Sequence, residues 1–158
     1  MAGLAYDLTM DLDRFLEAHD RLGPVVHIAT ITGDGRPHVT PIRVSWHDGF
    51  LYAVVGLHGT KARNLRRLPR VCLHYQVGPD THWDGLMVWG LGAVLGSVAD
   101  KVQLWPNVFA ADLERQYPDG PESAHDIGFL RVTVQRAVLL HDGGDRDEWR
   151  PDPVRVSS

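Results

Sequence analysis

Apolar and polar residues alternate along much of the chain, in runs that end at glycine, proline and aspartate residues. Alternation with a period of two is typical of strands that bury one face, and β-branched residues are frequent in these runs. The pattern predicts six strands, at about 24–32, 37–46, 50–56, 70–77, 86–97 and 128–141. The turns "GDGR" and "HDG" join the first three, which predicts an antiparallel meander.

Three other segments repeat their apolar residues at helical spacing and are bounded by capping or breaking residues. They predict helices at about 11–22, 60–68 and 99–116. Pro69 ends the second helix, and Pro106 is expected to kink or divide the third.

Hairpin-linked strands with few helices indicate a mainly β (α+β) fold, namely a six-stranded antiparallel β-barrel with peripheral helices. Gly90, Gly92 and Gly96 predict a bulge or a close backbone approach in the fifth strand. Residues 1–145 are expected to form one domain. The polar, proline-containing residues 146–158 are expected to form a loosely held C-terminal tail.

The third and fifth strands, "FLYAVV" and "LMVWGLGAVL", carry apolar residues on both faces. The interior of one small barrel cannot bury both faces, so a partner chain is expected on the outside. The sequence therefore predicts a homodimer.

Composition narrows the classes of function. The 158 residues carry a formal net charge of −4, so a basic surface for nucleic acid is not expected. The one cysteine, Cys72, cannot form an internal disulfide, and the first residues lack the pattern of a secretory signal. No apolar run is long enough to cross a membrane. A cytoplasmic protein that binds no nucleic acid and no membrane is expected.

The segment "GLHGTKARNLRR", residues 56–67, contains one of the two lysines of the chain. A helix start offers unpaired backbone N–H groups and the positive end of the helix dipole. Gly59 allows close approach, Thr60 can cap the helix or donate its hydroxyl, and Lys61 adds a charge. With Asn64 one turn further on, these residues form a candidate phosphate cradle. The alternative is an ordinary capped helix with solvated arginines.

Arg43 lies in the middle of the predicted strand "PIRVSW" and shares a strand face with Pro41 and Ser45. A partly buried arginine needs an anionic partner, which a phosphate held at Lys61 would supply. The alternatives are an arginine that faces solvent and one that pairs with Asp48.

The segment "GRPHVTPIRVSWHDGFLYAVVGLHGTKARNLRRLPRVCLHYQV" resembles the pyridoxamine 5′-phosphate oxidase-like, FMN-binding split-barrel proteins. The shared features are a "DGRPHVTP" hairpin, a strand ending in glycine, a "T-x-K-x-x-N-L" helix start and an "x-P-R-V" entry into the next strand. The resemblance is strongest over residues 24–77 and looser in the later strands. It implies a six-stranded split β-barrel, a homodimer, and two cofactor sites at the dimer interface.

The resemblance also implies where the cofactor lies. Its phosphate and ribityl chain would contact the second strand and the helix start, and its ring would lie beside the end of the third strand. The partner chain would contribute Trp89 and Arg131. The candidate cofactor-binding residues are Pro41, Ile42, Arg43, Val44, Ser45, Val55, Gly56, Thr60, Lys61, Asn64, Trp89 and Arg131.

One departure from the family limits the choice of substrate. The oxidases that act on pyridoxamine phosphate carry extra basic residues near the C-terminal end, for the phosphate of the substrate. Arg150 and Arg155 lie in a tail without that pattern, so this substrate is not expected.

The family resemblance and the candidate phosphate cradle together predict a flavin-dependent oxidoreductase. It would bind FMN and transfer a hydride or electrons to an unidentified small molecule. The 8-hydroxy-5-deazaflavin coenzyme would suit the same cradle, with Arg63 and Arg67 beside its longer tail. A protein that holds flavin or haem without turnover is the other alternative. No catalytic residue is assigned. His27, His38 and His74 could line a cavity, but the histidine spacings give no metal-binding motif, so no metal is expected.

Overall fold

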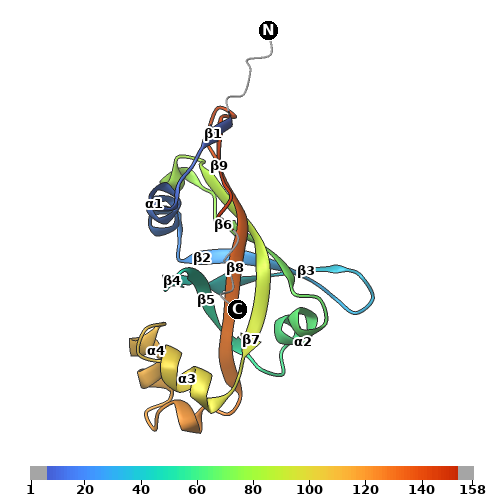
Figure 1. Ribbon diagram of the computed structural model, residues 1–158, viewed down its shortest axis with the longest axis vertical. Helices are drawn as coiled ribbons and strands as arrows, with labels where there is room; N and C mark the ends of the chain where they lie inside the picture. Colours follow the sequence, from blue (N-terminus) through green and yellow to red (C-terminus); the bar gives the residue numbers. More distant parts are fainter. Residues whose placement is uncertain (1–6, 153–158) are drawn as a thin grey trace.

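The computed structural model describes residues 7–152 and shows one twisted sheet of nine strands with helices around it (Figure 1). The strands are β1 (Asp7–Thr9), β2 (Val25–Ile31), β3 (Pro37–Arg43), β4 (Ser45–His47), β5 (Phe50–Gly56), β6 (Arg70–Tyr75), β7 (Gly85–Leu95), β8 (Ile127–Leu140) and β9 (Arg146–Trp149). The helices are α1 (Leu12–Leu22), α2 (Thr60–Arg67), α3 (Val98–Leu104) and α4 (Ala110–Gln116), with 3-10 turns at Pro79–Thr81 and Pro121–Ser123. Within the described part of the chain, every helix is too short or too polar to span a membrane.

Antiparallel pairing joins most of the strands into a split barrel. β3, β2, β6, β7, β8 and β5 are neighbours in that order. β3 and β4 form one bent strand interrupted at Val44, so its first half pairs with β2 and its second half with β5. β5 pairs with β4 and β8 but not with β3, which leaves an opening between β3 and β5. The predicted fold class, a mainly β split barrel with peripheral helices, is confirmed.

Two strands were not predicted. β1 pairs in parallel with β9, and β9 pairs antiparallel with the end of β8. Residues 146–149 therefore belong to the sheet, which corrects the expectation of a loosely held tail from residue 146. The short polar sequence "RDEW" has no apolar alternation that could reveal this strand. Residues 153–158 of the predicted tail lie outside the described part of the chain.

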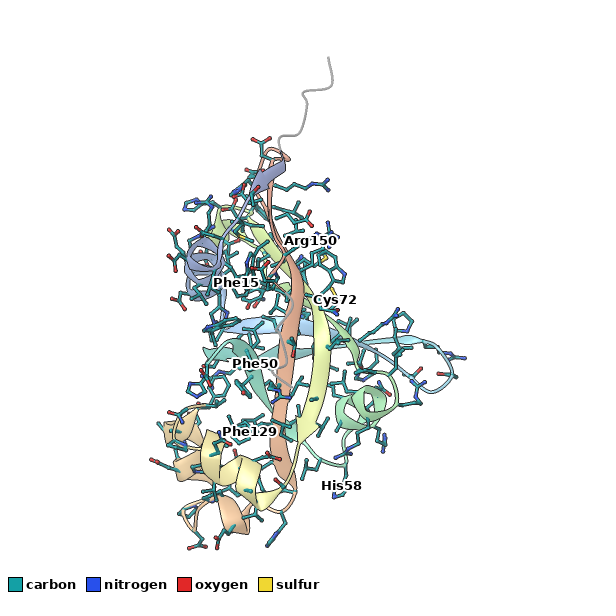
Figure 2. The ribbon with its side chains drawn as sticks, in the orientation of Figure 1. Phe15, Phe50, His58, Cys72, Phe129 and Arg150 are labelled. Carbon is teal, nitrogen blue, oxygen red and sulfur yellow. The ribbon has the colours of Figure 1, made fainter. Side chains whose placement is uncertain are left out.

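Two apolar clusters hold the fold together. Inward-facing residues of the barrel strands and α1 form the first, in which Phe15, Ile28 and Leu73 are fully buried. The second lies between the sheet and the α3–α4 layer, around Tyr52 and Phe129 (Figure 2). The outer apolar face of β5, from which a partner chain was inferred, is therefore covered by the chain's own helices.

β7 keeps apolar side chains on its outer face, where Trp89 is half-buried and Leu91 is 39% exposed. The pairing register with β8 shifts between Trp89 and Gly90, where Gln135 of β8 has no partner, so the extra residue lies in β8 and not in β7 as predicted. A Cβ atom on Gly90 would collide with the backbone carbonyl oxygen of Thr133, so the close approach of β7 and β8 requires glycine.

The long helix predicted at 99–116 is divided into α3 and α4. Pro106 lies between the two helices. A proline has no backbone N–H to continue a helical ladder, so the division at this residue follows from its chemistry. Phe109 precedes α4 with a positive φ of 53°, which redirects the chain across the outer face of β5.

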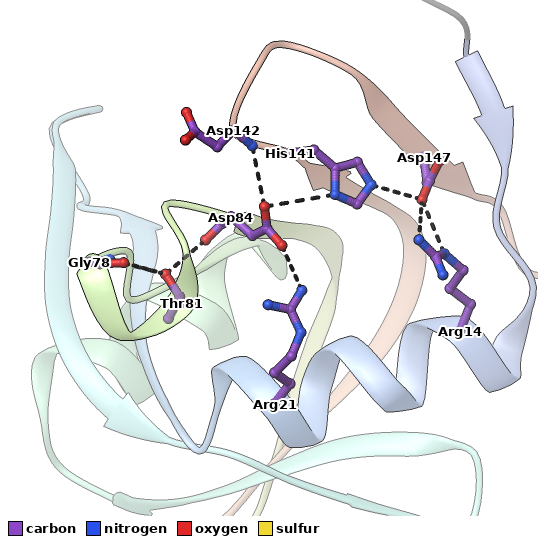
Figure 3. Close-up of polar contacts among 8 residues, drawn as sticks. All are labelled: Arg14, Arg21, Gly78, Thr81, Asp84, His141, Asp142 and Asp147. Carbon is purple, nitrogen blue, oxygen red and sulfur yellow. Dashed lines mark hydrogen bonds and ion pairs between the residues drawn. The ribbon is translucent and has the colours of Figure 1, made fainter.

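A polar network ties α1 to the β8–β9 turn and to the loop before β7 (Figure 3). The buried carboxylate of Asp147 in β9 lies 3.1 Å from Arg14 and 3.0 Å from His141. Asp84 accepts hydrogen bonds from Arg21 at 2.8 Å and from a backbone N–H of the β8–β9 turn at 3.2 Å. The His141 ring lies between the two carboxylates, with Nδ1 3.8 Å from Asp84.

Candidate functional site

A hollow of about 270 Å³ lies at the start of α2, between β3 and the end of β5. Its lining residues are His38, Thr40, Val55, Gly56, Gly59, Thr60 and Lys61. The Lys61 Nζ donates a hydrogen bond to the Thr40 Oγ1 at 3.1 Å, which fixes the ammonium group against β3. The structure thus brings together four predicted site residues, namely Val55, Gly56, Thr60 and Lys61.

The start of α2 is open to an anion. Gly59 is the N-cap residue, no side chain caps the helix, and the first turn contains no acidic residue. Thr60 is therefore the first helical residue and not the cap, and its hydroxyl accepts a hydrogen bond from Arg63 at 3.3 Å. A Cβ atom on Gly59 would lie 3.2 Å from the carbonyl oxygen of Gly56, so this tight turn favours glycine. The first-turn N–H groups, the helix dipole and Lys61 make the hollow electropositive.

His38 of β3 adds a polar group to the same hollow. Its Nδ1 atom is buried and has no hydrogen-bond partner among residues 7–152. Buried polar atoms are nearly always paired in folded proteins, so this unpaired nitrogen of a lining residue is an exception at the edge of the hollow. The sequence indicated only that His38 could line a cavity.

A second cavity, of about 250 Å³, lies between β3, β5 and α4. Its lining residues are Ile42, Arg43, Val54, Phe109, Asp112, Leu113 and Gln116. Arg43 donates a hydrogen bond to the Asp112 carboxylate at 2.7 Å, and its guanidinium carbon lies 4.8 Å from the centre of the Phe109 ring. The hydrogen bond from Arg43 is the main reason that the pKa of Asp112 is lowered from its ordinary value.

Arg43 and Lys61 do not meet in this chain. Arg43 is three residues from Thr40 on β3 and therefore points to the opposite side of the strand from the residue that holds Lys61. The Arg43 side chain is 55% exposed and pairs with Asp112, not with Asp48 as one alternative held.

The hollow and the second cavity follow the same opening in the barrel. β3 contributes Thr40 to the hollow and Ile42 to the second cavity. β5 contributes Val55 to the hollow and Val54 to the second cavity. Residues two apart on a strand are separated by about 7 Å, so the two spaces are close neighbours. The opening therefore offers an electropositive end beside an end with several apolar side chains.

Four other predicted residues line neither space. Val44 is buried in the barrel core, and the buried amide of Asn64 donates a hydrogen bond to the Thr30 hydroxyl at 3.0 Å. Pro41 is exposed on β3, and Ser45 pairs with the strand residue Tyr52.

The two residues assigned to a partner chain also lie away from both spaces. The Arg131 guanidinium lies 5.0 Å from the centre of the Phe50 ring, and its Nε is buried without a hydrogen-bond partner in the described chain. Burial raises the pKa of Tyr52, and the charge and hydrogen bond of Arg131 act in the opposite direction. Trp89 holds the guanidinium of Arg136 over its ring at 4.9 Å.

The strand histidines do not converge on a metal site. His27 and His74 are paired neighbours on β2 and β6. Burial, with a smaller contribution from His27, lowers the pKa of His74. Within residues 7–152, no group of three His, Cys, Asp or Glu side chains is arranged to hold a metal ion.

The sequence analysis did not identify five lining residues of the two spaces, namely Thr40, Phe109, Asp112, Leu113 and Gln116. Thr40 could have been predicted, because it is two residues from both His38 and Ile42 and therefore lies on the same face of β3. Asp112 could not be predicted, because it is 69 residues from Arg43 in a segment without a motif.

The family model described as "Pyridoxamine 5'-phosphate oxidase" matches residues 12–141. The chain belongs to this family. The match contains the hollow at the start of α2 and the second cavity, so both lie in the part of the chain that defines a pyridoxamine 5′-phosphate oxidase family member.

Solved structures share this fold at low sequence identity. A protein from Clostridium acetobutylicum related to general stress protein 26 has a TM-score of 0.70 at 20% identity, covering 89% of this chain and 96% of its own. An F420 reductase has a TM-score of 0.56 at 24% identity, covering 75% and 94%. A heme binding protein from Mycobacterium smegmatis has a TM-score of 0.64 at 18% identity, covering 84% and 58%. These similarities establish the fold only. No match to a curated protein was found.

Proposed function

We propose that this chain binds FMN in the opening between β3 and β5 and acts as a flavin-dependent oxidoreductase on a small molecule. The observation that carries the proposal is the hollow at the start of α2, where Lys61 and the uncapped N–H groups converge and His38 adds a polar lining residue. Membership of the pyridoxamine 5′-phosphate oxidase family supports the same assignment.

The residues present fit a flavin mononucleotide. The phosphate would accept hydrogen bonds from Lys61, from the Thr60 hydroxyl and from the first-turn N–H groups of α2. The ring would extend toward Ile42 and Val54 in the second cavity. The two spaces, of about 270 and 250 Å³, together reach the size of small-molecule sites.

Bound FMN would supply the hydride and electron transfer, and the chain would bind and orient it. The ion pair of Arg43 with Asp112 is the nearest charged group in the second cavity, where a substrate would approach the ring. A substrate that carries its own phosphate is not proposed, because the described lining of this cavity contains only one basic side chain, Arg43.

The 8-hydroxy-5-deazaflavin coenzyme is the second candidate, because an F420 reductase shares the fold over 75% of this chain. Its phosphate would take the same place. Arg63 and Arg67, both exposed on α2, would lie beside an anionic tail. Arg67 already donates a hydrogen bond to the carbonyl oxygen of Ile31, so this tail would compete with a contact inside the chain.

A homodimer is part of the proposal. The half-buried Trp89 and the exposed Leu91 form an apolar strip on the outer face of β7 that a second copy would cover. In that arrangement Trp89 and Arg131 would complete the cofactor site across the interface.

The absorption spectrum of the purified protein, followed by titration of the apo-protein with FMN, deazaflavin coenzyme and haemin, tests these assignments. Saturable FMN binding and turnover with a nicotinamide donor and an electron acceptor support the proposed oxidoreductase. Binding without turnover leaves a flavin carrier. Preferential haemin binding would support the haem alternative, for which the heme binding protein of the same fold is the precedent.

A further inference from the structure

The long strand β8 has a gap in its pairing along one edge. β5 pairs with it as far as Val132, and β9 pairs with it from Ala137 onward. A cavity of about 420 Å³ lies at this gap, on the opposite end of β5 from the hollow at α2. Its lining residues are Leu12, Trp46, Gly49, Phe50, Thr133, Val134, Gln135, Trp149, Pro151 and Asp152.

Aromatic rings form much of the wall of this cavity. The ring centroids of Trp46 and Trp149 lie 6.5 Å apart with their planes inclined at 60°. The fully buried Phe15 contacts both, at 5.5 Å from Trp46 and 4.7 Å from Trp149. Because Phe15 is fixed in the core, both indole rings are held in place before any ligand arrives. Phe50 adds a third ring (Figure 2).

The charged residue of the lining is an acid, and a cation outside the lining, Arg131, lies 5.0 Å from the centre of the Phe50 ring. Asp152 is the one charged side chain among the lining residues, and no lysine or arginine lines the cavity. The neighbouring Arg150 is held 2.7 Å from Glu148. Aromatic faces are electron-rich and attract cations, and a carboxylate adds a full negative charge.

We infer that this cavity binds a small organic cation with apolar substituents, such as a quaternary ammonium compound. The cationic group contacts the faces of Trp46 and Trp149, and Asp152 compensates its charge at the mouth of the cavity. Thr133 and Gln135 supply hydrogen bonds to a neutral polar group at the other end of the ligand. The site is separate from the proposed FMN site and does not depend on it.

Isothermal titration with acetylcholine and with its uncharged carbon isostere, 3,3-dimethylbutyl acetate, tests the inference. The two probes have the same shape, so a difference in affinity reports the positive charge. Acetylcholine is expected to bind about tenfold more tightly than the isostere. Equal affinities, or the failure of both probes to bind at millimolar concentration, would overturn the inference.

Two exposed aspartates provide a matched pair of variants. Asp152→Asn is expected to lower the affinity for acetylcholine several-fold and to leave the affinity for the isostere unchanged. Asp145→Asn, in the β8–β9 turn outside the lining, is expected to change neither. Because both side chains are exposed, neither replacement should disturb the fold. Equal effects of the two variants on acetylcholine binding would remove Asp152 from the site and contradict the inference.

Discussion

Lys61 and His38 reach the hollow at α2 from different elements. Lys61 is the second residue of α2 and is fixed by its hydrogen bond to Thr40, whereas His38 is the second residue of β3. An anion in the hollow would pair with the ammonium group and would lie beside the imidazole ring. At the residue scale, the site combines the Lys61 ammonium group, the His38 imidazole and several backbone N–H groups.

Arg43 gives the first prediction. Because it faces Asp112 on the side of β3 away from Lys61, Arg43→Lys is expected to change the affinity for FMN by less than about threefold, within the range of ordinary surface substitutions. A lysine can keep the ion pair with Asp112 across a similar distance. Fluorescence titration of the apo-protein with FMN measures the affinity. A loss of tenfold or more would place Arg43 on the phosphate, as the sequence pattern first suggested.

At the scale of elements, the network around Asp84 predicts a dependence of stability on pH. Burial opposes ionisation of this carboxyl, but the hydrogen bonds from Arg21 and the Asp142 backbone outweigh burial and lower its pKa from the ordinary 3.8. A lowered pKa stabilises the folded state at pH values above 3.8, and this stabilisation disappears as the pH falls through the folded-state pKa.

The variant Asp84→Asn lacks this carboxylate, so it is expected to melt at a lower temperature than the original chain at neutral pH. The difference is expected to shrink as the pH falls below 3.8. Thermal melts of both proteins over this range measure it. A difference in melting temperature that stays constant with pH would show that the Asp84 charge does not stabilise the fold.

The close approach of β7 and β8 at Gly90 gives a prediction for one glycine. Gly90→Ala is expected to lower the free energy of unfolding by about 1–3 kcal/mol, because the added methyl group overlaps the Thr133 carbonyl oxygen. Gly78→Ala is the control, since a Cβ atom there meets nothing within 4 Å. Denaturant unfolding of the two variants compares them. Equal stabilities would mean that the strands can separate locally at no cost.

Some strands could be predicted from the sequence and others could not, and the difference has physical causes. β2, β5, β6, β7 and β8 carry the alternation or apolar runs that buried strands require, and their positions were predicted. β9 was missed because its buried member is the polar Asp147, whose Oδ2 accepts from Arg14 and lies within hydrogen-bond distance of His141. The Lys61 cradle follows from local spacing, whereas the Arg43–Asp112 pair depends on how α4 folds over β5, which no local pattern records.

At the scale of the whole molecule, the proposed dimer depends on the outer face of β7. Leu91→Glu would bury a charge in that interface, so it is expected to convert the dimer to a monomer and to weaken FMN binding. Leu140→Glu is a matched control, since Leu91 and Leu140 are both 39% exposed. Light scattering after size-exclusion chromatography reports the mass of each variant. A monomeric original chain at micromolar concentration would refute the dimer.

The most direct test of the proposed function is the affinity of apo-protein for FMN in the original chain, Lys61→Ala and Arg66→Ala. Removing a charge-assisted phosphate contact costs about 1.5–3 kcal/mol, so Lys61→Ala is expected to bind FMN about 10- to 100-fold more weakly. Arg66 is an exposed control on the same helix, lies outside the lining of the hollow and donates its hydrogen bond to the carbonyl oxygen of Leu57. Its replacement is expected to leave the affinity within about threefold. Equal affinities of the original chain and Lys61→Ala would contradict the phosphate site at α2.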